Sequence, residues 1–192
     1  MRRRGYVLAG GNSRRMGVDK AFLRVSSQSA VERQCQLLQE ICPDGVFIVG
    51  RNKELFESQP WVHLEDQDGG QGPLDGIATA LNHAQEGIAF ILAVDLFTVT
   101  KDDFDALYLA MSQSQADVVY AYSTDDKQIE VNQPLCSAWR VSSTSDIVNR
   151  SLAAGERKVS QVVQTLETMR VLVPFSHLAN VNSPEDFSRL KS

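Results

Sequence analysis

Glycines followed by clustered cations form the strongest chemical pattern in this sequence. Gly10 and Gly11 directly follow a short apolar segment, and three cations come within the next nine residues, namely Arg14, Arg15 and Lys20. Glycines let backbone N–H groups approach an anion closely, and the cations add positive charge beside them. The pattern predicts a loop that holds a triphosphate; a glycine-rich turn with solvated arginines is the alternative. It has neither the Walker A spacing nor the G-x-G-x-x-G spacing, which disfavours a redox dinucleotide.

A carboxylate follows the most apolar segment of the chain. Residues 88–94 are all apolar, which indicates a strand buried on both faces, and Asp95 comes directly after them. In open α/β sheets, ligands bind outside the carboxyl ends of the strands. Mg²⁺ prefers oxygen ligands and is usually shared with substrate phosphates. The position predicts that Asp95 holds Mg²⁺, and a cap on the following turn is the alternative.

Acidic residues and glycines come together again at 65–76. Glu65 and Asp66 follow an expected strand at 61–64, and glycines then recur up to Gly76. Glycines beside a strand end permit close approach to a flat ligand such as a nucleobase. The segment predicts a base-binding loop, with a plain connecting loop as the alternative.

An alternation of strands and helices must position these three segments. Apolar runs predict strands at 5–10, 46–49, 61–64, 88–94, 117–122, 133–139 and 171–173. Apolar residues at helical spacing predict helices at 29–41, 74–81, 104–111, 143–153 and 158–166, and Ser183-Pro184 is typical of a helix start. The alternation predicts an α/β fold, with three layers and a mostly parallel sheet that has helices on both faces. The three segments then lie at one edge of one sheet.

Length and composition narrow the class of protein. The 192 residues predict a single domain over 1–192, and a net charge of −5 excludes a broad basic surface for duplex nucleic acid. No apolar run approaches the ~20 residues of a membrane span, and no long apolar segment follows the N-terminal arginines. Three scattered cysteines predict buried, reduced thiols in a cytoplasmic protein rather than a disulfide framework or a zinc site.

Several motifs together resemble the molybdenum cofactor guanylyltransferase (MobA-type) family of the nucleotidyltransferase superfamily. They are Leu8-Ala-Gly-Gly-x-Ser-x-Arg-Met-Gly-x-Asp-Lys20, Glu65-Asp66, Gly72-Pro-Leu-x-Gly-Ile77, Asp95, Gln133-Pro-Leu135, Gly155-Glu-Arg-Lys158 and Asn180-Val-Asn-Ser-Pro-Glu185. The first motif is shared with sugar-nucleotide pyrophosphorylases. Its combination with the last motif is much more specific, and the resemblance covers nearly the whole chain.

The resemblance implies a reaction in which GTP and molybdenum-bearing molybdopterin give the guanine dinucleotide cofactor and pyrophosphate, with Mg²⁺ as cofactor. It implies that the nucleotide is bound by Leu8, Ala9, Gly10, Gly11, Lys20, Asp66 and Asp95. The implied catalytic residues are Lys20, Arg15 and Asp95, with Asp95 as the metal ligand. The N-terminal half is thus expected to bind the nucleotide.

The C-terminal half is expected to bind the acceptor. The resemblance points to Arg157, Lys158, Asn180 and Asn182 on the pterin side, although Asn182 with Ser183 is also explained as a helix cap. The implied partners are GTP and a molybdopterin-type acceptor. Molybdenum-insertion proteins and molybdoenzyme chaperones are candidate protein partners, and neither nucleic acid nor a membrane is expected.

Two positions depart from the family pattern. Gly50 stands where the family often has an asparagine, with Asn52 two residues on, and the run Asp95-Leu-Phe-Thr98 lacks the usual proline. These departures leave a non-catalytic, nucleotide-binding regulatory or chaperone-like module as an alternative. A cytidylyltransferase or a sugar-phosphate nucleotidyltransferase is another, because the preference for guanine rests on resemblance alone.

Overall fold

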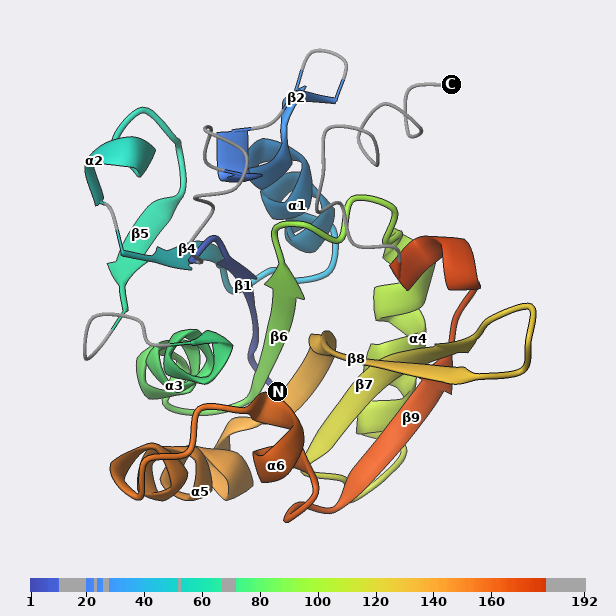
Figure 1. Cartoon of the computed structure of the whole chain (residues 1–192). Helices are drawn as coiled ribbons and strands as arrows, with labels where there is room; N and C mark the ends of the chain where they lie inside the picture. The colour runs from blue at the N-terminus through green and yellow to red at the C-terminus, as the bar shows by residue number, and fades with distance from the viewer. Residues whose placement is uncertain (11–19, 23, 26–27, 52, 67–71, 179–192) are drawn as a thin grey trace.

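Seven strands form one sheet at the centre of the molecule in the computed structural model, which describes residues 1–10, 20–22, 24–25, 28–51, 53–66 and 72–178 (Figure 1). Their order across the sheet is β5-β4-β1-β6-β8-β7-β9. Their bounds are β1 Arg3–Leu8, β4 Val46–Gly50, β5 Val62–Glu65, β6 Ile88–Ala93, β7 Val118–Thr124, β8 Glu130–Arg140 and β9 Thr168–Leu172. A second, two-stranded sheet pairs β2 (Arg24–Val25) with β3 (Gln28–Ser29).

Most neighbouring strands in the large sheet run parallel. β1 pairs parallel with β4 and β6, β4 with β5, and β7 with β9, whereas β8 runs antiparallel to β6 and β7. β8 reverses because a short turn joins it to β7, in which the Asp125 carboxylate accepts the N–H groups of Lys127 and Ile129. The mostly parallel sheet is confirmed, and it brings the carboxyl ends of β5, β4, β1 and β6 to one edge.

The helices pack on both faces of the sheet. Their bounds are α1 Ala30–Gln39, α2 Lys53–Phe56, α3 Pro73–Ala84, α4 Lys101–Ser112, α5 Val141–Ala153 and α6 Val159–Val163, and two 3-10 helices are η1 Lys20–Phe22 and η3 Phe175–Leu178. Capping boxes begin α1 at Ser29 and α4 at Thr100, while Pro73 opens α3.

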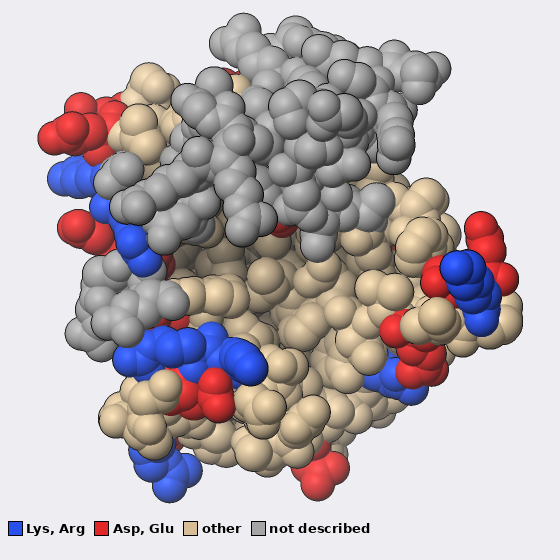
Figure 2. All heavy atoms as spheres, in the orientation of Figure 1, with Lys and Arg blue, Asp and Glu red and all other residues tan. Residues whose placement is uncertain are grey.

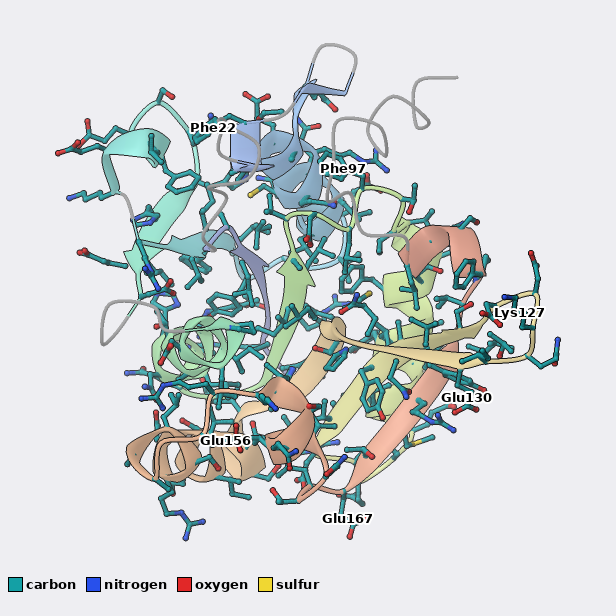
Figure 3. The ribbon with its side chains drawn as sticks, viewed as in Figure 1. Phe22, Phe97, Lys127, Glu130, Glu156 and Glu167 are labelled. Carbon is teal, nitrogen blue, oxygen red and sulfur yellow. The ribbon has the colours of Figure 1, made fainter. Side chains whose placement is uncertain are left out.

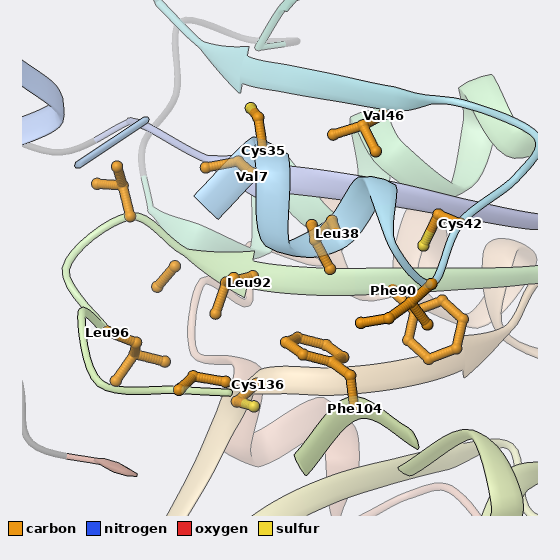
Figure 4. Close-up of a cluster of buried hydrophobic side chains, with 14 of the residues drawn as sticks. Val7, Cys35, Leu38, Cys42, Val46, Phe90, Leu92, Leu96, Phe104 and Cys136 are labelled. Atoms are coloured by element: carbon orange, nitrogen blue, oxygen red, sulfur yellow. The ribbon is translucent and has the colours of Figure 1, made fainter. Parts of the chain in front are cut away.

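Two apolar cores join these layers. One lies between the sheet and α1 and α4, where Leu38, Phe90 and Phe104 are fully buried (Figure 4). The other joins the opposite face to α3, α5 and α6 through side chains such as Leu74 and Val162. The three cysteines are free and buried, as expected. Within the described part of the chain, no helix is both long and apolar enough to cross a membrane.

The differences from the sequence-based prediction concern element ends, such as β8 at 130–140 rather than 133–139, and short elements, including the unpredicted β2 and β3. The last strand spans residues 168–172 rather than 171–173, and the helix expected at 158–166 is limited to 159–163. The elements η1, α2 and η3 were not predicted, because three or four residues are too few to show a hydrophobic period. The helix start expected at Ser183 lies outside the described residues.

Candidate functional site

The chain segments that follow β1, β4, β5 and β6 meet at the carboxyl edge of the sheet. Backbone hydrogen bonds continue past the strands: Ala9 N–H donates to Val49 O at 2.8 Å, Val94 N–H to Leu8 O at 3.1 Å, and Asp66 N–H to Gly50 O at 3.3 Å. The described parts of the three predicted segments therefore come together, as the parallel sheet requires.

Two glycines make room for the Asp66 carboxylate at this edge. A Cβ added to Gly10 would lie 2.9 Å from Asp66 Oδ2, and one added to Gly76 would lie 3.5 Å from Asp66 Oδ1. Larger residues at either position would press on the carboxylate or on the Leu8 side chain, 3.2 Å from the same Gly76 position. The glycines thus keep Asp66 beside the end of β1, where the base and ribose are expected.

Asp66 has a second carboxylate, Asp75, in its electrostatic environment. The pKa of Asp66 is raised to about 6, mainly by burial and also by the charges of Asp75 and Glu65, while Arg51 acts in the opposite direction. Asp75 is only 2% exposed. Asp66 Oδ1 and Asp75 Oδ2 are buried without a hydrogen-bond partner among the described residues. Unsatisfied acceptors of this kind are suited to N–H donors, which a nucleobase carries.

Asp75 was not predicted as a site residue. It occupies the variable position of the Gly72-Pro-Leu-x-Gly-Ile77 motif and lies in the first turn of α3. An acid there is ordinary at a helix start, because it interacts favourably with the helix dipole. The signal that could have singled it out is its place between two glycine-rich segments, but only packing reveals its burial.

Asp95 lies in the turn after β6 and is partly buried. The turn begins with a hydrogen bond from Leu96 N–H to Ala93 O at 3.2 Å. The described residues contain no group of three His, Cys, Asp or Glu side chains that could hold a metal. One carboxylate nevertheless fits Mg²⁺, since this ion is commonly held by one or two carboxylates together with substrate phosphates.

Arg157 lies close to the start of α3, and Lys158 follows it in the chain. A Cβ added to Gly72 would be 3.4 Å from Arg157 O. The α5–α6 connection therefore adjoins Gly72, which belongs to the predicted base-binding loop. Glu156 (labelled in Figure 3) accepts the backbone N–H groups of Arg157 and Lys158, both at 2.7 Å. These hydrogen bonds lower the pKa of Glu156. A carboxylate of the chain itself thus occupies backbone donors beside the two cations expected to meet an anion.

The remaining predicted residues are not placed. Gly11, Arg14, Arg15, Asn52, Asn180 and Asn182 lie outside the described residues, as does the Lys20 side chain, whose backbone opens η1. Their roles stay predictions. Figure 2 shows the face toward the viewer hollowed at its centre, with mainly uncharged residues in the hollow and with Lys and Arg side chains beside Asp and Glu on both sides of it.

Most of the chain matches one known protein family. A model of the MobA-like NTP transferase domain matches residues 5–169. The chain belongs to the MobA-like NTP transferase family. A protein of this family is a nucleotidyltransferase, so the resemblance found in the motifs is confirmed and the chain is an enzyme.

Similar proteins agree with membership of the MobA-like family. A Mycobacterium tuberculosis protein named probable molybdenum cofactor guanylyltransferase is 34% identical over 185 residues, covering 93% of this chain and 88% of its own. One of the same name from Opitutus terrae is 32% identical over 195 residues, covering 96% and 93%.

Solved structures share the fold. The molybdopterin-guanine dinucleotide biosynthesis protein A of Archaeoglobus fulgidus has a TM-score of 0.78 at 23% identity, covering 98% of this chain and 96% of its own. The bifunctional IspDF of Campylobacter jejuni has a TM-score of 0.82 at 16% identity, covering 98% and 54%. The α/β nucleotidyltransferase fold is therefore confirmed.

Proposed function

We propose that this nucleotidyltransferase transfers GMP from GTP to molybdenum-bearing molybdopterin, giving the guanine dinucleotide cofactor and pyrophosphate. The observation that carries the proposal is the glycine-lined carboxyl edge of the sheet, where Asp66 lies beside Gly10 and Asp95 follows the neighbouring strand. The relatives named molybdenum cofactor guanylyltransferase support guanine and molybdopterin as the two substrates.

The reaction proceeds by in-line attack of the terminal phosphate oxygen of the pterin on the α-phosphorus of GTP. A new P–O bond forms to the pterin phosphate, and the bond to the β-phosphate oxygen breaks, so that pyrophosphate leaves. No protein nucleophile is needed, because positioning and charge stabilisation carry most transfers of this type. The backbone at 8–10 would orient the nucleoside, and Lys20 with Arg15 would stabilise the charge that grows on pyrophosphate.

Mg²⁺ is the proposed cofactor, and Asp95 is the described residue that would hold it. When bound, the ion would neutralise charge on the phosphate oxygens. On the acceptor side, Arg157 and Lys158 would contact the pterin phosphate, while Asn180 and Asn182 would offer amide groups to the pterin ring. Arg157 O adjoins Gly72, so the proposed acceptor site lies next to the predicted base-binding loop. Transfer between two bound substrates requires such proximity.

Pyrophosphate release tests the proposed function. Purified chain is incubated with molybdopterin, Mg²⁺ and either GTP, CTP, ATP or UTP, and pyrophosphate is measured together with the dinucleotide product. We expect product with GTP and little with the others. Faster transfer from CTP would assign the chain to the cytidylyl branch, and nucleotide binding without pyrophosphate release would indicate a non-catalytic module. Thermal shifts with each nucleotide separate binding from turnover.

The metal assignment has its own control. Asp95→Asn keeps the side-chain shape but removes the charge, so we expect it to fold and to lose nearly all turnover. Asp102→Asn is the matched control, because Asp102 is an exposed acid in the first turn of α4. Near-normal activity of Asp95→Asn with Mg²⁺ would remove Asp95 from the metal site.

A further inference from the structure

The loop that follows Asp95 is held by contacts at three successive residues. Gln34 Nε2 donates to Leu96 O, and Arg33 Nε donates to Phe97 O at 2.8 Å. Thr98 Oγ1 donates to Ser176 O at 2.6 Å. Two adjacent residues of α1 thus fasten the loop from one side and η3 from the other. Such contacts restrict a loop that lacks the proline usual in the family.

Gln34 is an unexpected residue at its position. Its side chain is 0% exposed, although it belongs to the face of α1 that contributes Val31, Cys35 and Leu38 to the apolar core. Its Nε2 has the Leu96 carbonyl as partner, but its Oε1 is buried without a hydrogen-bond partner among the described residues. A half-satisfied amide stabilises a core less than an apolar residue of the same size. Stability alone therefore does not explain a glutamine here.

The position of Leu96 shows what Gln34 controls. Leu96 is the residue after Asp95, and its side chain is fully buried in the core (Figure 4). The Leu96 carbonyl accepts a hydrogen bond from Gln34. The backbone that follows Asp95 is therefore held both by the buried Leu96 side chain and by this hydrogen bond. Phe97 follows in the same loop (Figure 3), and its carbonyl accepts the hydrogen bond from Arg33.

The far end of the loop is also fixed. The Asp103 carboxylate accepts Thr100 N–H at 2.8 Å within the capping box of α4. The same carboxylate lies 2.9 Å from His177 Nδ1 in η3. These contacts hold the end of the loop that leads into α4. The contacts from α1 hold the other end, which follows Asp95.

We propose that Gln34 is a positioning residue for Asp95. By holding the Leu96 carbonyl, it keeps the Asp95 carboxylate in the orientation that binds the divalent cation with the nucleotide. Arg33 assists through the next carbonyl. The inference rests on the proposed function, because it requires Asp95 to be a metal ligand.

Gln34→Met tests the proposal, with Gln39→Met as the matched control on the exposed side of the same helix. Methionine has nearly the same length as glutamine but does not donate to Leu96 O. It also removes the unpartnered Oε1, so we expect Tm to change by no more than about 4 °C. If Gln34→Met does not fold, Arg33→Met is tested in its place. This variant removes the hydrogen bond to Phe97 O, and Arg33 is partly exposed.

The main measurement is Mn²⁺ affinity by electron paramagnetic resonance, with a non-hydrolysable GTP analogue bound. We expect Gln34→Met to weaken Mn²⁺ binding about 10- to 100-fold, as is common when a group that orients a metal ligand is lost. Affinity for the analogue without metal should stay unchanged. In turnover assays, the Mg²⁺ concentration for half-maximal rate should rise, and high Mg²⁺ should restore most of kcat.

The controls separate this inference from the proposed function. Weak Mn²⁺ binding in Asp95→Asn and in Gln34→Met, with normal binding in Gln39→Met, supports both. Weak binding in Asp95→Asn alone overturns the role of Gln34 and leaves the proposed function intact. Unchanged binding in Asp95→Asn overturns the metal assignment and the inference together. A Gln34→Met variant that loses GTP affinity without metal would show a general structural role and would also overturn the inference.

Discussion

Asp66 Oδ2 lies 2.9 Å from the point where a Cβ on Gly10 would be. That distance is shorter than ordinary contact, so any other residue at position 10 must displace the carboxylate. An aspartate side chain can rotate away at little structural cost, so the displacement should affect the site rather than the fold. Gly10 and Asp66 therefore act as one unit at the end of β1.

Gly10→Ala should fold normally and weaken GTP binding, because it displaces Asp66 and narrows the approach to the backbone. Asp66→Ala should weaken binding by a similar factor, and the double variant should lose little more than either single variant. Isothermal titration of all three measures this coupling. Effects that multiply in the double variant would show that the two residues act independently.

Asp66 should make stability depend on pH. Its pKa is raised from 3.8 to about 6 in the folded protein, mainly by burial, so the folded state holds the proton more tightly than the unfolded chain. The contribution to the free energy of unfolding is therefore full below about pH 4 and is lost as the pH rises through about 6. In wild type this loss lowers the free energy of unfolding by about 1–2 kcal/mol, after allowance for the partial exposure of Asp66, and Asp66→Asn should abolish it.

Thermal unfolding of Asp66→Asn and wild type between pH 4 and 8 checks this prediction. The two curves should diverge toward neutral pH, where the variant becomes relatively more stable while binding nucleotide less well. Asp102→Asn, which changes an exposed acid, controls for net charge. Parallel curves for Asp66→Asn and wild type would show that the pKa of Asp66 is not raised.

Lys20→Ala should lower the affinity for GTP and slow the transfer of GMP. Loss of one charged donor to phosphate costs roughly 1.5–3 kcal/mol, which is about 10- to 150-fold. Titration of GTP and single-turnover measurements test both effects. Lys127→Ala is the control, because Lys127 is exposed in the turn between β7 and β8 (Figure 3). Unchanged GTP affinity together with an unchanged rate would remove Lys20 from the site.

Arg157→Ala combined with Lys158→Ala should weaken molybdopterin binding at least about tenfold, as expected for loss of charged donors, and leave GTP binding nearly intact. Arg157 also donates to Leu152 O at 2.9 Å and Glu156 O at 2.8 Å, so the double variant should lose stability. Lys158→Ala alone changes only an exposed side chain and separates the two effects. Normal pterin affinity in a folded double variant would place the acceptor elsewhere.

The order of strands and helices was predictable from the sequence by itself. The apolar run at 88–94, the helical spacing of Val31, Cys35 and Leu38, and the glycines that follow β1 are local patterns, and local patterns determine secondary structure. The parallel sheet then follows from the alternation of elements, and with it the meeting of the segments that carry Gly10, Asp66 and Asp95. The family was also recognisable, because its motifs are short and contiguous.

Only the tertiary structure showed which distant residues act on these segments. Gln34 and Leu96 are 62 positions apart, and nothing in the spacing of either indicates their hydrogen bond. Asp75 reads as an ordinary acid at a helix start until packing buries it and its charge acts on Asp66. The physical reason is that burial and long-range contact depend on how elements pack, whereas residue patterns determine only the local structure and the face that each element buries.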